Sequence, residues 1–136
     1  MSVIAPFTAT ELEYLAVQRL GRLATVQPDG TLQVSPVGYR YNAETGTIDI
    51  TGYNMAASRK FRNVADNGRV AFVVDDVPSV NPWRVRCVEI RGHGEALETP
   101  DPIIRIHPRR VISFGLDEPD GDAHQLTVNK RDIPAA

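Results

Sequence analysis

The 136-residue chain has little of what marks several special classes of protein. One cysteine, Cys87, excludes an intrachain disulfide, and three scattered histidines have no spacing typical of a metal site. A net charge of -2 gives no electrostatic reason to expect nucleic-acid binding. No apolar run reaches transmembrane length, and residues 1–6 lack a basic region followed by a long apolar one. We expect one domain, residues 1–136, in the cytoplasm, with no membrane, nucleic-acid or metal partner.

What is present is a succession of short strands. The capping-box spacing of Thr10 and Glu13 predicts a helix over about residues 10–19. Turn signals at residues 28–30 and 43–46 then separate segments with strand character. The strands are expected at residues 20–27, 31–42, 47–53, 69–77 and 84–98, with residues 103–116 forming a last pair or one kinked strand.

The second strand is irregular, because its apolar pattern changes parity at Ser35-Pro36. Proline cannot donate to a strand ladder, so it indicates an edge strand or a bulge. A bulge beside Gly38 would leave backbone groups free for a planar ligand. A barrel corner without a ligand explains the pattern equally well.

The most informative stretch follows the strand at residues 47–53. Apolar residues at helical spacing predict a helix with Asn54 as its N-cap and its end near Gly68. Ser58, Arg59 and Lys60 then lie in its first turns, where free N–H groups and the positive dipole end gather beside a hydroxyl and two cations. This combination is typical of a phosphate site. The alternative is a solvated helix face.

Arg62, one turn after Ser58, would either join this site or pair with Asp66. The tail over about residues 117–136 is acidic and is expected to be mobile. Six or seven mostly antiparallel strands with short helices predict a mainly β fold, a closed or split barrel. A barrel of this size has little interior room, so a large ligand is expected on its outside, most naturally at a dimer interface.

The ordered motifs resemble those of a known family. A helix is followed by Leu-Gly-Arg-Leu-Ala-Thr-Val and a Pro-Asp-Gly turn, then Val-Ser-Pro-Val-Gly-Tyr, a strand, Ser-Arg-Lys and Val-Glu-Ile-Arg-Gly-His-Gly-Glu. Over residues 7–116 the chain is similar to the pyridoxamine 5′-phosphate oxidase-like superfamily, which has the FMN-binding split barrel. It looks most like small actinobacterial members that use the deazaflavin coenzyme F420.

The resemblance implies a homodimer with two cofactors held in clefts between subunits. It assigns the cofactor phosphate to Ser58, Arg59 and Lys60, and it places Trp83 at the pocket rim, although Trp83 could equally cover a barrel end. A weaker correspondence puts Arg105, His107, Arg109 and Arg110 where the second subunit could reach the site. The strand that runs along the flavin or deazaflavin ring corresponds to Ser35, Pro36, Val37 and Gly38.

The chain has no C-terminal segment like the one that completes the pyridoxal phosphate site of pyridoxamine oxidase proper. This favours hydride transfer between reduced F420 and a conjugated small-molecule acceptor over vitamin B6 oxidation. The alternatives are an oxidoreductase that uses FMN and a non-enzymatic flavin or F420 carrier. A cationic groove continuing through Arg62, Arg84 and Arg86 would favour F420, whose tail is anionic.

No catalytic residue is assigned from the sequence. Protonation of the reduced acceptor could come from water, and Tyr39, Tyr53 and His107 are candidate donors only. No serine lies in a nucleophile-elbow pattern, so a hydrolytic role is not predicted.

Overall fold

A computed structural model of the chain describes residues 5–116 and 127–135. Within these residues it contains two α-helices, one 3₁₀ helix and eight strands. The helices are α1 (Ala9–Val17), η1 (Met55–Ala57) and α2 (Arg59–Asn67). The strands are β1 (Gly21–Val26), β2 (Leu32–Val37), β3 (Arg40–Asn42), β4 (Thr47–Ile50), β5 (Arg69–Val80), β6 (Trp83–Leu97), β7 (Ile103–Phe114) and β8 (Asn129–Asp132).

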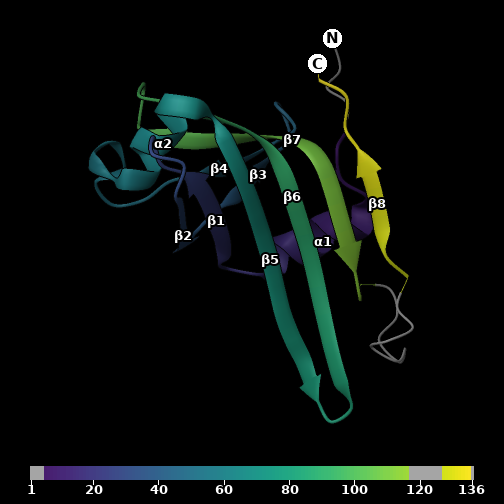
Figure 1. The fold of residues 1–136 in the computed structure, drawn as a ribbon. Helices are drawn as coiled ribbons and strands as arrows, with labels where there is room; N and C mark the ends of the chain where they lie inside the picture. The colour runs from purple at the N-terminus through teal and green to yellow at the C-terminus, as the bar shows by residue number, and fades with distance from the viewer. Residues whose placement is uncertain (1–4, 117–126, 136) are drawn as a thin grey trace.

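The strands form one antiparallel sheet in the order β2-β1-β5-β6-β7-β4-β3, with β8 also paired to β7 (Figure 1). Its two edge strands, β2 and β3, are separated in the chain only by Gly38 and Tyr39. No ladder joins them in the described part of the chain. The sheet therefore curls back on itself but stays open at this seam, which confirms the expected mainly β split barrel. The strand count is slightly higher than predicted.

The structure corrects one detail that was predicted from the sequence, the bulge in the second strand. The register between β1 and β2 runs without a shift from Leu32 to Val37, so no bulge forms at Ser35-Pro36. Pro36 is tolerated because β2 is an edge strand, which was the other option that the sequence left open. The apolar pattern changes parity because Leu32 and Val34 lie on the exposed face of β2, whereas Val37 lies on its buried face.

The capping box of the first helix lies two residues earlier than expected. Thr8 is its N-cap: the Thr8 hydroxyl accepts from the Glu11 N–H at 3.1 Å, and the Glu11 carboxylate accepts from the Thr8 N–H at 2.9 Å. Thr8 and Glu11 have the same capping-box spacing as Thr10 and Glu13, so spacing alone could not choose between them. Among the described residues, no helix is long and apolar enough to cross a membrane.

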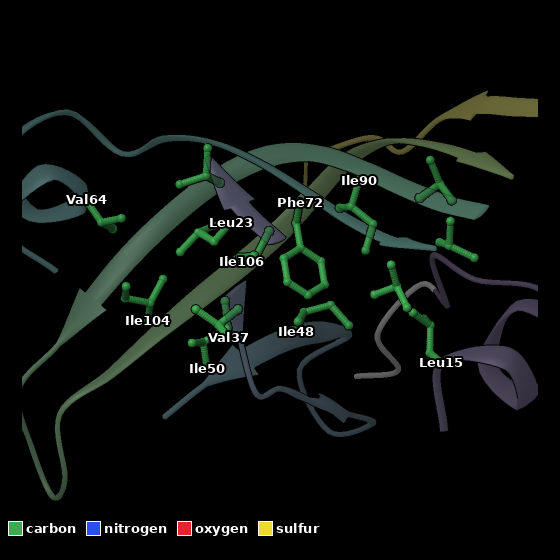
Figure 2. Packing of buried hydrophobic residues seen from close by; sticks show 14 of the residues in the cluster. Leu15, Leu23, Val37, Ile48, Ile50, Val64, Phe72, Ile90, Ile104 and Ile106 are labelled. Carbon is green, nitrogen blue, oxygen red and sulfur yellow. The ribbon is translucent and has the colours of Figure 1, made fainter. Parts of the chain in front are cut away.

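The core lies on the concave side of the sheet (Figure 2). It is made mainly of β-branched and aliphatic side chains that alternate along the strands, with Phe72 at its centre. Gly21 makes room for this ring, because a Cβ there would lie 2.1 Å from Cζ of Phe72. The fully buried members include Leu23, Ile48, Ile50, Val74, Val88, Ile90, Ile104, Ile106 and Val111.

The hairpin of β5 and β6 extends well beyond the rest of the sheet (Figure 1). The sequence predicted a loop from residue 78 to 82, but β5 continues to Val80 and β6 resumes at Trp83. Pro78 interrupts neither strand, because the register shifts between Asp76 and Ser79 and no third strand pairs there. Residues 77–85 are called the arm below.

The strand β8 was missed by the sequence reading. It pairs with β7, and Arg131 on it contacts the buried carboxylate of Glu11 on α1. The chain's last strand is thereby tied to its first helix. The rest of the tail that was expected to be mobile, residues 117–126 and 136, lies outside the described residues.

Candidate functional site

The start of α2 is built by Ser58, which is its N-cap in place of the expected Asn54. Asn54 instead precedes η1 in a left-handed conformation, with φ of 52°. The Ser58 hydroxyl accepts from the Phe61 N–H at 3.2 Å and donates to the Met55 carbonyl at 2.6 Å. Its hydrogen-bonding capacity is therefore used to hold the turn. The N–H groups of Arg59 and Lys60 keep no partner within the helix, as in any first turn.

Three cations surround this helix start: Arg59, Lys60 and Arg62. In the described ranges none of them forms an ion pair, and the alternative pair of Arg62 with Asp66 is not made. One acid that interacts with Arg59 is Asp29, in the β1–β2 turn. Hydrogen bonds from Thr31 chiefly hold the pKa of Asp29 below its usual value, and the charge of Arg59 adds to this. The cations are therefore available to an anion.

The edge of β2 supplies the second half of the site. Ser35 points to the same side of the sheet as Leu23, its partner on β1, and its Oγ is buried with no hydrogen-bond partner among the described residues. Val37 is buried in the core, whereas Gly38 has nothing within 4 Å of the position that a Cβ would take. An edge strand with an unpartnered hydroxyl and open space beside it can receive a polar, flat ligand.

Asn63 connects the two halves, and sequence reasoning missed it. Its side chain, 1% exposed, donates from Nδ2 to Thr25 Oγ1 at 3.0 Å and to Gln33 Oε1 at 3.3 Å, which ties α2 to β1 and β2. Its Oδ1 has no partner in the part of the chain described. The available signal was an amide between Phe61 and Val64 on the buried face of a helix.

Trp83 does not join these residues within one chain. It pairs with Val80 at the far end of β5, whereas α2 ends directly before the near end of β5 at Arg69. Twelve strand residues span roughly 35 Å at about 3.3 Å per residue, so Trp83 lies far from the start of α2. Figure 1 shows the tip of the β5–β6 hairpin at the opposite end of the molecule from α2. The structure therefore places Ser35–Gly38 and Ser58–Lys60 on two elements, β2 and α2, that Asn63 joins through Gln33, and it places Trp83 apart from them.

The cationic groove suggested for the F420 tail is not continuous in one chain. Arg86 forms two hydrogen bonds with Asp76, at 2.9 and 2.6 Å, and lies over the Tyr14 ring at the base of the arm. Arg84 belongs to the arm itself.

The β7 residues that a second subunit was expected to reach are mostly engaged inside the chain. Arg105 bonds the buried Asp49 at 3.0 and 3.2 Å, and His107 Nε2 lies 2.9 Å from Glu95 Oε1. Arg110 pairs with Asp132 at 2.7 Å, while the Arg109 guanidinium donates to the carbonyl of its neighbour Pro108 at 3.2 Å. The side chains of Arg105, His107 and Arg110 thus join β7 to β4, β6 and β8.

The candidate proton donors differ in exposure: Tyr39 is partly buried, whereas Tyr53 is exposed. Tyr39 donates to the Leu15 carbonyl at 2.7 Å, and burial raises its pKa to about 12, so it is a poor donor to an outside ligand. Tyr53 is fully exposed in the loop before η1, close in sequence to Ser58. Burial likewise raises the pKa of Cys87 to about 11, which keeps it a thiol.

These observations fit a ligand with a phosphate and a flat polar ring. The phosphate would take the free N–H groups and side chains of Arg59 and Lys60, and the ring edge would find Ser35 Oγ. No group of His, Cys, Asp and Glu suited to a metal ion occurs among the described residues.

Comparisons with known proteins identify the family of the chain. Residues 7–115 match the model of the pyridoxamine 5′-phosphate oxidase family. A 5a,11a-dehydrotetracycline/5a,11a-dehydrooxytetracycline reductase of Streptomyces rimosus is 49% identical over 96% of this chain and 95% of its own.

Solved structures extend the likeness to the fold. A conserved hypothetical protein of Mycobacterium tuberculosis aligns over 87% of this chain and 91% of its own, with a TM-score of 0.69 at 20% identity. A structure titled F420 reductase, 26% identical, aligns over 76% and 94% with a TM-score of 0.55. On the match of its sequence over residues 7–115 and of its fold, the chain belongs to the pyridoxamine 5′-phosphate oxidase-like family of split-barrel proteins.

Proposed function

We propose that the protein is an F420-dependent reductase that acts on a conjugated small-molecule acceptor. The observation that carries this proposal is the 49% identity, over nearly the whole of both chains, to a reductase of dehydrotetracyclines. The prefix 5a,11a-dehydro in that name denotes a carbon–carbon double bond, so we infer an unsaturated, conjugated acceptor for this protein as well. The neighbour titled F420 reductase supports the choice of cofactor.

The residues at the start of α2 would hold the cofactor. Arg59 and Lys60 offer two unpaired cations and two free N–H groups to its phosphate, while Ser58 keeps the turn in shape. The edge of β2 from Ser35 to Gly38 would lie along the ring. When bound, reduced F420 supplies the hydride. The protein contributes position, charge and exclusion of water.

We assign no catalytic side chain. Water can supply the proton that accompanies the hydride, and among the side chains considered above Tyr53 is the exposed hydroxyl nearest in sequence to the helix start. We further propose that the protein is a homodimer with its cofactor sites between the subunits, because the separation of Trp83 from α2 leaves the predicted pocket open on one side in a single chain.

FMN remains the second candidate cofactor for one specific reason. The cations expected to continue the groove beyond Arg62, namely Arg84 and Arg86, belong to the β5–β6 hairpin, far from α2 in the same chain. A long anionic tail therefore has less to bind in one chain than the sequence suggested.

A pair of titrations tests the proposal. Purified protein is titrated with F420 and, separately, with FMN, and binding is followed by cofactor fluorescence. Tight F420 binding, followed by acceptor-dependent oxidation of reduced F420, is the expected result. Tight binding of FMN without binding of F420 would mean that the protein is an FMN-dependent oxidoreductase. F420 binding with no turnover on any conjugated acceptor favours a carrier, and binding of neither cofactor overturns the site.

A further inference from the structure

The buried side chain of Asn63 donates both of its N–H groups to the β1–β2 hairpin, one of them to a second amide, Gln33. Nδ2 bonds Thr25 Oγ1 and Gln33 Oε1, while Oδ1 accepts no hydrogen bond among the described residues. Leaving a buried amide oxygen unsatisfied is an unfavourable way to hold a helix against a sheet. An apolar side chain would pack there without that cost, so the contacts of Asn63 point to a task other than stability.

These contacts fix which end of the Gln33 amide faces the protein. Its Oε1 accepts from Asn63 Nδ2 at 3.3 Å and from the Thr25 hydroxyl at 3.5 Å. Thr25 Oγ1 itself accepts from Asn63, so its own hydrogen is available to Gln33. With its oxygen held in this way, the half-buried Gln33 turns its Nε2 away from the network. That Nε2 makes no hydrogen bond within residues 5–116 and 127–135, so it is an oriented, unused donor.

The course of α2 brings its first residues to the free edge of β2. Near the end of the helix, Asn67 donates to the Val26 carbonyl on β1 at 2.7 Å, and one turn earlier Asn63 reaches both β1 and β2. Followed back toward its start, the helix therefore runs from β1 across β2, the edge strand (Figure 1). Arg59 lies one further turn back on the same face, and its charge acts on Asp29 in the turn of this hairpin.

Gln33 thus lies between the two parts of the candidate site. It precedes Ser35 by two residues on β2, so both side chains point to the same face of the strand, with their Cα atoms about 6.6 Å apart. Asn63 holds it against α2, about 6 Å along the helix axis from Arg59. A ligand with its phosphate at the helix start and its ring along residues 35–38 passes the Gln33 amide.

An unused N–H donor at this place suits a phosphate oxygen. Phosphate oxygens accept hydrogen bonds, and the cations of Arg59 and Lys60 already favour a phosphate at the helix start. A fixed amide adds a directed donor on the β2 side of the phosphate, where these two side chains, which come from the helix, give none. A carboxylate in the place of this amide would repel the same group.

We propose that Gln33 is a further cofactor-binding residue, whose Nε2 donates to the phosphate held at the start of α2. Asn63 and Thr25 are positioning residues that act through Gln33, because they hold its oxygen and thereby aim its nitrogen. This inference rests on the proposed function, from which the phosphate-bearing ligand is taken.

Gln33→Glu tests the contact with little change of shape. The carboxylate keeps one oxygen that accepts from Asn63 and Thr25, but it turns a second oxygen, instead of a donor, toward the phosphate. Gln27→Glu is the matched control, because it adds the same charge to the same hairpin and its side chain bonds only Thr31 Oγ1, at 2.8 Å, among the described residues.

Each protein is titrated with F420 and with FMN, and thermal unfolding checks each fold. For the cofactor that the wild type binds, we expect Gln33→Glu to lower the affinity by about tenfold or more, because a charge-assisted donor is replaced by a repelling oxygen. Gln27→Glu should change the affinity by no more than about threefold, because solvent screens a charge in the exposed turn.

Phosphate-free ligands locate the contact. Riboflavin is FMN without its phosphate, and the matching ligand for F420 is the deazaflavin that lacks its phosphate and tail. The wild type and Gln33→Glu should bind these ligands with equal affinity, because the repelled group is missing. A general disturbance of β2 would weaken both kinds of ligand alike, so an equal loss with and without phosphate overturns the assignment.

A double-mutant cycle tests whether Asn63 acts through Gln33. Asn63→Leu should lower the affinity for the phosphorylated cofactor several-fold, because the Gln33 amide is no longer held. In a Gln33→Met background the same substitution should cause no further loss. Thr25→Val, which removes only the hydroxyl from the network, is carried through the same cycle and covers the case in which Asn63→Leu does not fold. Losses that simply add in the cycle overturn the positioning role.

The outcomes separate this inference from the proposed function. Cofactor binding by the wild type with unchanged affinity in Gln33→Glu, or with an equal loss in Gln27→Glu, overturns the role of Gln33 and leaves the proposed function standing. A wild type that binds neither F420 nor FMN overturns the proposed function, and the role of Gln33 is overturned with it.

Discussion

The hydroxyl of Tyr14 donates a hydrogen bond to Oδ1 of Asp76 at 2.8 Å and thereby joins the first helix to the base of the arm. Asp76 also binds Arg86, which lies over the Tyr14 ring at 5.1 Å from its centroid. This hydrogen bond with Arg86 is the main cause that holds the pKa of Asp76 below its usual value, against the opposing effect of burial. The three side chains therefore anchor the base of the arm to α1.

Tyr14→Phe should loosen the arm while the barrel stays folded. The variant loses one hydrogen bond, worth about 1 kcal/mol. Tyr39→Phe is the matched control, because its hydroxyl makes a bond of 2.7 Å to the Leu15 carbonyl, away from the arm. Urea unfolding should show similar losses of stability for both. Only Tyr14→Phe should increase acrylamide quenching of Trp83, and an equal increase in both variants would contradict this assignment.

Gly21→Ala should destabilise the core by overpacking. The added methyl would lie 2.1 Å from Cζ of Phe72, which is 1% exposed, so the ring must leave its position. Changes of this kind cost about 1–3 kcal/mol, measured as a lower urea midpoint with an unchanged slope.

Gly38→Ala is the counterpart at the candidate site. A methyl there meets nothing within 4 Å, so the free energy of unfolding should change by no more than about 0.5 kcal/mol. If the ring of the cofactor runs along Ser35–Gly38, the same methyl should weaken cofactor binding. An unchanged dissociation constant would place the ring elsewhere.

Glu11→Gln should remove most of the contact between α1 and β8. Burial works against the charge of Glu11, but hydrogen bonds from Arg131, Ser113 and Thr8 outweigh it and leave the pKa below its usual value of 4.5. Breaking a buried pair costs about 3–5 kcal/mol, and we expect the lower end because Arg131 is partly exposed.

The pH dependence of this variant has a definite sign. A carboxyl whose pKa is lower in the folded state stabilises the fold above its unfolded pKa of about 4.5, and this contribution is lost as the pH falls through the folded pKa. The wild type should therefore lose more stability than Glu11→Gln on acidification below about pH 5. Parallel stability curves for the two proteins would contradict the assignment. Asp49, whose pKa is also lowered, is present in both proteins, so both should still lose some stability on acidification.

Local signals explain what the sequence could predict. The hairpin of β1 and β2 turns at Gly30, with φ of 88°, and α2 ends at Gly68, with φ of 68°; both conformations favour glycine, and both were readable as turn or stop signals. The helix before Gly68 was also predicted from local spacing, although its N-cap is Ser58 and not Asn54; the phosphate role of Ser58, Arg59 and Lys60 stays a prediction.

Long-range pairing explains what was missed. Two prolines made residues 78–82 look like a loop, yet the arm forms because its strands pair with each other at an edge where a missing N–H has no cost. The strand β8 has no apolar alternation and is held by Arg131 and Asp132, whose partners Glu11 and Arg110 are far away in the sequence. Asn63 was missed because the partners of its side chain lie on two other strands.

Replacing both Arg59 and Lys60 with Ala should separate binding from folding. Neither side chain forms an ion pair in the described ranges, and cations at a helix start oppose the dipole, so the free energy of unfolding should stay the same or rise by a few tenths of a kcal/mol. Charge-assisted hydrogen bonds contribute about 1.5–3 kcal/mol each, so cofactor affinity should fall by about tenfold or more for each cation lost.

Ser58→Ala is the matched variant for this pair. It removes the N-cap and should lower the free energy of unfolding by about 1 kcal/mol, with a smaller loss of affinity that follows from the disturbed turn. Thermal unfolding and fluorescence titration on the same samples measure both quantities. Loss of affinity with Ser58→Ala but not with the double variant would mean that the helix start, rather than its cations, holds the phosphate. No change in either would show that the ligand binds elsewhere on the barrel.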